Sequence, residues 1–406
     1  MKLTYKTSQN NYYSFLWHAT FLALAKNFMD IDTIIPSMVI DAGGTAISIG
    51  ILTAILIAGG EISQLVFSPF LSNKQHKKLF LLGGINIRLI ALLGMALLFL
   101  FSHNLSGNIV ILSIFFLITI FSFSGGFTNI SYMDILGKSI LPEKRKHFFS
   151  LQQVIGSVGL LSSAYFSRYL LKMNSYPQNY TILFFIATIL LGIATLGFWK
   201  IKEVRIDFTK TSNIKEYLFK IKKEFKSNYR LKNYLLLINT QGIILTLMPF
   251  LILYSKKTFG VENQLIGNYL FLKILGGVIT GGIIFLLAKK IRYHFILYIT
   301  TSMSIFILIW VLVFPVATFF PYIFLFGGVI YTLYSVSKTG ILLEISTNEN
   351  RAIYTGLTGL GSIIPAIFPI LGGWIISHFG FNTFFIIFLL ILILSTYFIH
   401  KLNCKQ

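Results

Sequence analysis

Long apolar stretches, separated by short polar segments, fill nearly the whole 406-residue chain. A membrane-spanning helix needs roughly 20 mostly apolar residues in a row. Twelve stretches meet or approach that length, at about 14–39, 46–71, 79–101, 109–136, 148–171, 180–199, 233–255, 265–288, 295–314, 320–343, 352–376 and 382–399. The pattern predicts an all-α membrane protein with twelve transmembrane helices, and it excludes a soluble enzyme.

The basic residues between these stretches alternate from one side to the other. Of the 34 Lys and Arg residues, 26 lie in segments that share the side of both termini, and five lie within the stretches. Only Lys172, Lys256 and Lys257 lie in loops on the opposite side. Because Lys and Arg in short loops favour the cytoplasmic side, we expect both termini in the cytoplasm of an inner-membrane protein. The net charge of +21 then reflects this orientation, not nucleic-acid binding.

The longest polar stretch, at about 200–232, divides the predicted helices into six and six. Apolar residues recur within it at helical spacing among lysines, a pattern typical of an amphipathic helix on the anionic inner leaflet. The expected domains are an N-terminal six-helix bundle over 1–200, a cytoplasmic linker over 201–232 and a C-terminal six-helix bundle over 233–406.

Three segments of the first half recur in the second half in the same order. Residues 70–74 resemble 286–290, Lys26-Asn27 with Pro36 resembles Asn239-Thr240 with Pro249, and residues 142–145 resemble 348–351. The offsets, 216, 213 and 206 residues, are nearly constant. These matches indicate an internal duplication, and two six-helix halves with a binding site between them are a transporter plan.

With these features, the chain resembles the major facilitator superfamily over essentially its whole length. In that family the loop between spans two and three usually reads Gly-x-x-x-Asp-x-x-Gly-[Arg/Lys]-[Arg/Lys]. Residues 68–78 keep the basic end, with Ser72 at the position of the Asp, and Glu143–Arg145 and Glu349–Arg351 resemble the turns that open spans five and eleven. The arginine of span four that is typical of proton-coupled drug exporters is missing. The resemblance implies two pseudo-symmetric bundles, alternating access, and a cavity lined by the first helix of each half.

Span one contains three charged residues, which are costly in a bilayer and commonly functional. On a continuous helix, Lys26 and Asp30 would be i,i+4 neighbours on one face that Thr33 continues, whereas Asp32 would point roughly 120° away. We predict that Lys26, Asp30 and Thr33 bind substrate or protons, and Asp32 is a further candidate. Alternatively, the pair neutralises itself and only packs, and Asp32 accepts a hydrogen bond near the Pro36 kink.

The spans of the second half contain deeply placed lysines but no acidic residues at the same depth. Lys273 lies in span eight, and Tyr331, Tyr334 and Lys338 fall on one face of span ten. Lysines that face a cavity suit an anionic or zwitterionic substrate; the alternative is that Lys338 extends to the cytoplasmic interface. The uncharged lining candidates are Asn129, Tyr132, Asn239 and Gln241, which could instead make interhelical hydrogen bonds.

Glu61 and Arg88 each lie about thirteen positions from the loop between spans two and three, which predicts equal depth in antiparallel helices. We expect a buried ion pair with a structural role, or alternatively a Glu61 that leaves the pair and takes up a proton. Asp134, Arg145 and Arg351 lie at cytoplasmic helix ends and are predicted to have structural or gating roles.

The leading functional prediction is a secondary active transporter of a small solute, coupled to protons through Asp30, Asp32 or Glu61. Its expected partners are the solute, protons and membrane lipids, with no cofactor, no metal and no nucleic acid, and the protein is expected to be a monomer. The sequence has no phosphate-binding glycine loop, which excludes transport driven directly by ATP hydrolysis in this chain. It also has no Cys/His spacing typical of a metal site. The rivals are an intramembrane enzyme acting on lipid-linked substrates through His18, Lys26 and Asp30, and a transport-inactive sensor or scaffold.

Overall fold

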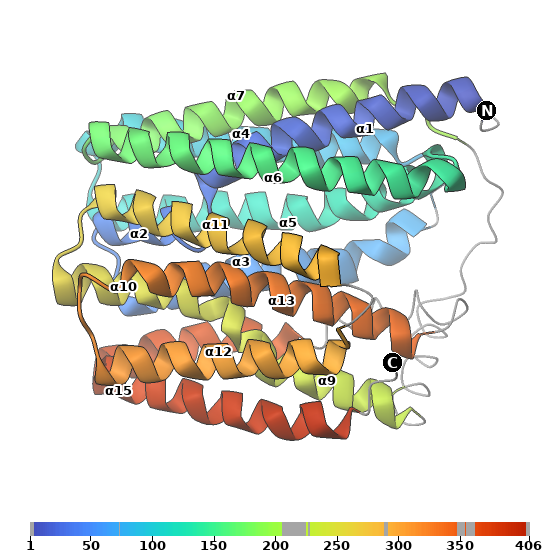
Figure 1. Cartoon of the computed structure of the whole chain (residues 1–406). Coiled ribbons are helices and arrows are strands. Elements are labelled where there is room, and N and C mark those ends of the chain that lie inside the picture. Colours follow the sequence, from blue (N-terminus) through green and yellow to red (C-terminus); the bar gives the residue numbers. More distant parts are fainter. Residues whose placement is uncertain are drawn as a thin grey trace. The chain divides into compact units, whose positions relative to one another are not determined.

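Every regular element that the structure describes is a helix (Figure 1). The structure, a computed structural model, describes residues 4–72, 74–204, 225, 228–287, 291–346, 354 and 362–402. Within these residues, nine helices are long and apolar enough to cross a membrane. The prediction of an all-α membrane protein is therefore confirmed.

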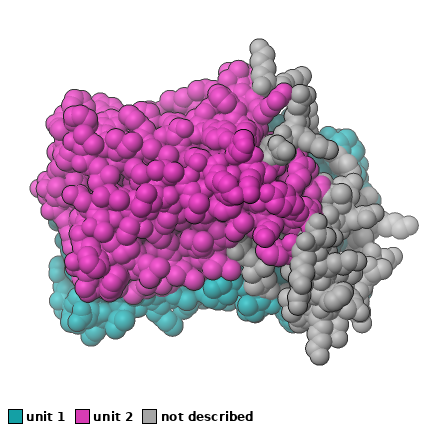
Figure 2. Space-filling view, turned by 90° about the horizontal axis from the view of Figure 1, so that it is seen from below, with its two compact units in different colours: residues 1–43, 59–211 teal, residues 44–58, 212–406 magenta. Residues whose placement is uncertain are grey.

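The contacts divide the chain into two compact units, residues 1–43 with 59–211 and residues 44–58 with 212–406 (Figure 2). Helix α3 (Ala46–Ser72) thus begins in the second unit and ends in the first. The other elements of the first unit are α1 (Tyr5–Lys26), the 3-10 turn η1 (Asn27–Met29), α2 (Ile34–Asp41), α4 (Lys78–Leu100), the 3-10 turn η2 (Ser102–Asn104), α5 (Gly107–Ser139), α6 (Pro142–Met173) and α7 (Gln178–Lys200). Helix α1 packs against α6 and α7, and α4 packs against α5 and α7 (Figure 1).

The remaining elements of the second unit follow the central polar stretch. They are α9 (Tyr229–Gln241), the 3-10 turn η3 (Gly242–Thr246), α10 (Leu247–Phe259), α11 (Asn263–Leu287), α12 (Tyr293–Val313), α13 (Pro321–Ile345) and α15 (Ile363–Lys401). Helix α11 packs against α13, and α15 packs against α9 and α12. Gly380 interrupts α15 with a φ of 82°, a left-handed conformation that favours glycine. The two parts of α15 correspond to the last two apolar stretches of the sequence.

The first helix begins earlier than its apolar pattern predicts, at Tyr5 instead of about residue 14. Thr4 caps it, since its Oγ1 accepts a hydrogen bond from the Thr7 backbone N–H at 3.2 Å. Asn11, which is fully buried, exchanges two 2.8 Å hydrogen bonds with the backbone of Lys202. A polar segment is therefore helical because tertiary contacts satisfy its side chains.

Glycines bring pairs of helices into close contact in both units. A Cβ atom on Gly126 of α5 would overlap the backbone oxygen of Gly60 on α3. In the second unit, a Cβ atom on Gly328 of α13 would overlap the backbone oxygen of Lys273 on α11. Small residues at such crossings let membrane helices approach through their backbones. The recurrence of this contact between the second and fourth apolar stretches of each half agrees with the duplication seen in the sequence.

Candidate functional site

The first apolar stretch is not one helix, because it breaks between Lys26 and Ile34. Asp30 lies in the break with an extended backbone and is only 5% exposed. Its Oδ1 accepts hydrogen bonds from the backbone N–H groups of Asp32 (3.1 Å) and Thr33 (2.9 Å) and from the Thr33 hydroxyl (2.8 Å). The carboxylate thereby closes the turn at residues 30–33, as Asp side chains commonly do. Asp30 therefore stabilises the turn that precedes α2.

This break corrects the predicted stripe of Lys26, Asp30 and Thr33. An i,i+4 relationship requires continuous α-helix, and the 3-10 turn η1 separates Lys26 from Asp30. Lys26 is exposed whereas Asp30 and Thr33 are buried and hydrogen-bonded to each other. Asp32 is half-buried. The physical reason is that Asp and Thr side chains compete for backbone N–H groups, which favours a turn over helix continuation.

Asn27 holds the broken helix against α6. Its Nδ2 donates to the Leu160 backbone oxygen at 2.6 Å and to the Ser163 hydroxyl at 3.0 Å, and the residue is fully buried. These two bonds connect the 3-10 turn to the middle of a neighbouring membrane helix. Asn27 was not among the predicted site residues, although its place beside three charged residues was a usable signal.

The two lining candidates on α5 have different surroundings. The Tyr132 ring lies 5.5 Å from that of Phe15, 6.1 Å from that of His18 and 6.0 Å from that of Phe198. The buried His18 ring in turn stacks on Phe198 at 3.8 Å. Tyr132 therefore belongs to an aromatic cluster inside the first unit, whereas Asn129 is exposed.

The structure does not join Glu61 and Arg88. No ion pair in the described part of the chain contains either residue, and the guanidinium carbon of Arg88 lies 4.1 Å from the centre of the Phe121 ring. The prediction of a closed Glu61–Arg88 bridge is therefore wrong for this structure. Equal depth along two helices does not determine how each helix is rotated about its own axis. Here the Arg88 side chain lies toward α5.

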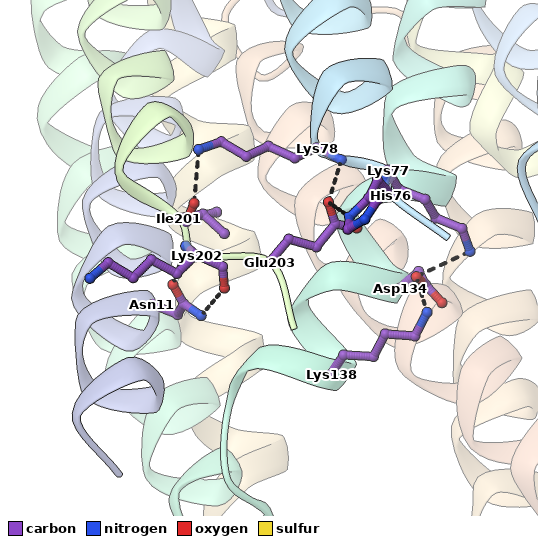
Figure 3. A network of polar contacts seen from close by, with 9 residues as sticks. All are labelled: Asn11, His76, Lys77, Lys78, Asp134, Lys138, Ile201, Lys202 and Glu203. Atoms are coloured by element: carbon purple, nitrogen blue, oxygen red, sulfur yellow. Dashed lines mark hydrogen bonds and ion pairs between the residues drawn. The ribbon is translucent and has the colours of Figure 1, made fainter. Parts of the chain in front are cut away.

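Asp134 pairs with two lysines near the C-terminal end of α5 (Figure 3). Its Oδ2 lies 3.1 Å from the Lys77 ammonium nitrogen and 2.6 Å from that of Lys138, one helical turn away. Arg145 lies at the next helix start, where its Nε donates to the Ile140 backbone oxygen at 3.0 Å and its Nη2 donates to that of Gly137. A cation on these carbonyls stabilises the C-terminal end of α5.

Glu203, which the sequence analysis did not identify, completes this network of polar contacts (Figure 3). Its two carboxylate oxygens accept the backbone N–H groups of Lys77 at 2.7 Å and Lys78 at 3.0 Å. The Lys78 ammonium group donates to the backbone oxygens of Trp199 (2.7 Å) and Ile201 (2.8 Å). The start of α4 therefore both donates backbone hydrogen bonds to Glu203, just after α7, and donates side-chain hydrogen bonds to the end of α7.

The second unit has a comparable break, where α9 gives way to η3 at Gly242. Asn239 accepts a 2.9 Å hydrogen bond from the Ile364 backbone N–H at the start of α15. Gln241 is fully buried, and its Nε2 donates to the Leu297 backbone oxygen (3.1 Å) and the Thr301 hydroxyl (2.8 Å) on α12. These predicted lining residues hold the broken segment to its neighbours.

The other predicted residues of the second unit lie on α11 and α13. Lys273 is buried, Tyr331 is exposed and Lys338 is half-buried. Tyr334 is buried, with its hydroxyl 2.8 Å from the place where a Cβ atom on Gly242 would lie. Glycine at the break therefore leaves room for the Tyr334 hydroxyl beside the backbone. Arg351 lies outside the described residues.

Comparison with known proteins decides the family. The sequence profile of the Major Facilitator Superfamily matches residues 16–362. The chain belongs to this superfamily. No curated protein sequence matches it significantly. The resemblance predicted from the sequence is confirmed.

Solved structures of major facilitator superfamily (MFS) transporters share the fold. The chain is similar to the nucleoside transporter NupG, with 13% identity over 98% of this chain and 100% of that chain and a TM-score of 0.67. It is also similar to a D-xylose-proton symporter, with 14% identity over 96% of each chain and a TM-score of 0.71. A POT family transporter in complex with a thioalcohol-conjugated peptide matches with 11% identity over 96% of each chain and a TM-score of 0.71. At these identities the likeness shows the fold alone.

This MFS protein has a further acidic residue that the hydropathy pattern hid. Asp41 ends α2, just beyond the predicted limit of the first stretch, and its Oδ2 accepts the Tyr180 hydroxyl at 2.6 Å. The Ser37 hydroxyl lies 2.9 Å from the same Tyr180 oxygen. Burial, with a smaller effect from Asp41, raises the pKa of the neighbouring Tyr176 phenol. Asp41 was missed because a charge at a predicted helix end resembles an ordinary loop residue.

Proposed function

We propose that this MFS protein is a secondary active transporter that moves a small solute across the membrane by alternating access. The observation that carries the proposal is the interrupted first helix of each half, at Asn27–Met29 and at Gly242–Thr246. Interrupted helices place backbone groups and polar side chains within the membrane, where secondary transporters bind solutes and ions. Membership of the superfamily favours a transporter over an enzyme.

Twelve spans in two pseudo-symmetric six-helix bundles account for the described helices. Nine helices meet the length and composition of a span, and Ile363–Lys401 supplies two spans because of its interruption at Gly380. The broken pair α1 and α2 and the helix α13 supply the remaining two. We place the bundles at 1–200 and 233–406, joined by a cytoplasmic linker at 201–232. The Lys and Arg distribution supports cytoplasmic termini in an inner membrane, and we take the transporter to act as a monomer.

Protons are the proposed coupling ion, and Asp30 is the proposed carrier. Its carboxylate accepts three hydrogen bonds in the turn that precedes α2. Hydrogen bonds to an ionised acceptor are stronger than those to a neutral one. Protonation of Asp30 would therefore loosen this turn and link proton uptake to the conformation of the broken helix. Asp32 and Glu61 are the alternative carriers.

The proposed solute carries an anionic or zwitterionic group. Lys273 lies buried in α11, and Lys338 lies half-buried on the helix that carries Tyr331 and Tyr334. Ammonium groups bind carboxylate or phosphate oxygens, and tyrosines add stacking surface and hydrogen bonds. Lys26, Asn129 and Tyr132 are the corresponding lining candidates of the first unit.

The test is solute-driven proton movement in proteoliposomes loaded with a pH-sensitive dye. The solute panel contains a nucleoside, D-xylose, a short peptide and small organic anions, of which the first three are the solute classes of the structurally similar transporters. At least one solute should move protons in the wild type, and Asp30→Asn should abolish that movement while sparing solute exchange. Asp32→Asn is the matched control. Unchanged proton movement in Asp30→Asn would remove Asp30 from the mechanism, and no solute-dependent flux in the wild type would contradict transport of these classes.

A further inference from the structure

Arg88 is a cation within a membrane helix that has no hydrogen bond or ion pair to any residue the structure describes. It lies ten residues after the start of α4 (Lys78–Leu100). At 1.5 Å per residue this is about 15 Å along the helix, the middle of a hydrocarbon core about 30 Å thick. The Nε atom of Arg88 is buried without a partner. Such a charge at this depth requires a physical explanation.

The free-energy cost of placing the Arg88 charge in the middle of the bilayer is large. Arginine stays protonated at any physiological pH, so Arg88 cannot escape the cost by becoming neutral. A charged group near the bilayer centre costs several kcal/mol unless other groups compensate it. The carboxylate of Glu61, the expected partner, makes no ion pair with it in the described part of the chain. A residue with these costs and no structural bond is a candidate for ligand binding.

The contacts that the structure gives Arg88 lie on one face of its guanidinium and use none of its N–H donors. The guanidinium carbon lies 4.1 Å from the centre of the Phe121 ring, a cation–π contact that fixes one face of the group. A Cβ atom on Gly125 would lie 3.4 Å from the same carbon, so the guanidinium also packs against the backbone of α5. Stacking uses the face of the guanidinium and leaves its edge, with the donor fork, for a planar acceptor. Carboxylate and phosphate groups match this fork through two parallel hydrogen bonds.

We propose that Arg88 is an anion-binding residue of this transporter and that the solute carries a carboxylate or phosphate group that accepts hydrogen bonds from its guanidinium. This inference rests on the proposed transport function and adds to Lys273 and Lys338 a further residue that recognises the charge. A lipid headgroup is the other source of such an oxyanion, but headgroups lie about 15 Å from the bilayer centre. A dissolved anion is therefore the proposed ligand.

The first test measures binding by the purified full-length protein in detergent. Inorganic phosphate, pyruvate, chloride and phosphatidylglycerol in mixed micelles serve as probes, with thermal stabilisation and calorimetry as readouts. At least one of the two oxyanions should stabilise the wild type, and chloride should not. Arg88→Lys keeps the charge but loses the fork, and it should raise the Kd about 10- to 100-fold. The control is Arg145→Lys at the inner end of α6, which should leave the Kd unchanged.

Two variants keep the test decisive if Arg88→Lys folds poorly. Phe121→Leu leaves Arg88 in place but removes the ring that fixes one face of its guanidinium, so it should also raise the Kd. Glu61→Gln should change the Kd less than about threefold, because the proposed ligand and not Glu61 neutralises Arg88. A loss in Glu61→Gln as large as that in Arg88→Lys would show that Arg88 serves a Glu61 pair and would overturn the inference.

Three other results would also overturn it: no stabilisation by either oxyanion, an unchanged Kd in Arg88→Lys, and stabilisation only by phosphatidylglycerol, which would assign the site to lipid. A transport assay distinguishes a failure of this inference from a failure of the proposed transport function. Solute flux that is identical in the wild type and in Arg88→Lys would refute the role of Arg88 and leave the transporter proposal intact. Oxyanion binding that depends on Arg88, without any flux, would contradict the transporter proposal and not the binding site.

Discussion

The carboxylate of Glu203 accepts hydrogen bonds from the backbone N–H groups of both Lys77 and Lys78, at 2.7 and 3.0 Å. The two lysines begin α4, and Glu203 lies 125 residues or more away in sequence, just past the end of α7. A helix start leaves four N–H groups without partners, and an anion there also interacts favourably with the helix dipole. Here the cap comes from a distant segment instead of the preceding residues.

Removing this cap should destabilise the start of α4 and its contact with the end of α7. We expect Glu203→Gln to cost about 1–2 kcal/mol, since an amide oxygen can replace only one of the two acceptors and carries no charge. The measurement is the midpoint of thermal unfolding in detergent. Glu143→Gln, an exposed acid in the first turn of α6, is the control and should change the midpoint little. Equal midpoints for both variants would show that the Glu203 cap contributes nothing.

Asn27→Ala should destabilise the broken first helix. The substitution removes the two donors that satisfy the Leu160 backbone oxygen and the Ser163 hydroxyl. Leaving buried polar groups without partners costs about 1–3 kcal/mol. The same thermal unfolding assay applies, with Asn129→Ala as the control because Asn129 is exposed. If the control variant loses as much stability as Asn27→Ala, the hydrogen bonds between Asn27 and α6 do not account for the destabilisation.

Gly328→Ala should prevent the close approach of α13 to α11. The added methyl group would overlap the backbone oxygen of Lys273, so the helices must separate. Overpacking of this kind costs typically about 1–3 kcal/mol. Gly282→Ala is the control on α11, since a Cβ atom there would meet nothing within 4 Å. A stable, active Gly328→Ala protein would show that this crossing tolerates a wider spacing.

The orientation in the membrane can be tested with single cysteines. After Cys404→Ser removes the native thiol, Ser175→Cys should react with an impermeant maleimide added outside intact cells, and Gln75→Cys should not. Both positions are exposed, so accessibility reports the side of the membrane and not burial. Permeabilised cells provide the control, in which both cysteines should react. Labelling of Gln75→Cys alone in intact cells would reverse the proposed topology.

The sequence by itself determined the class, the family and the expected orientation of this protein. Helix length, apolarity and loop charge are local properties, and a bilayer forces each spanning segment to satisfy its own backbone. For that reason the apolar stretches correspond to the described helices. The sequence pattern even separates the last two stretches, 352–376 and 382–399, at the place where Gly380 interrupts α15.

Only the tertiary structure decided how the polar residues are used. Periodicity placed Lys26 and Asp30 on one face, but the hydrogen bonds of Asp30 to Thr33 come with a turn that breaks the helix. Equal depth suggested a Glu61–Arg88 pair, but helix rotation, which depends on packing against α5, directs Arg88 to Phe121. The Glu203 cap was invisible because its partners are distant in sequence. Depth is encoded locally, whereas rotation and capping depend on neighbours that the chain brings together only when it folds.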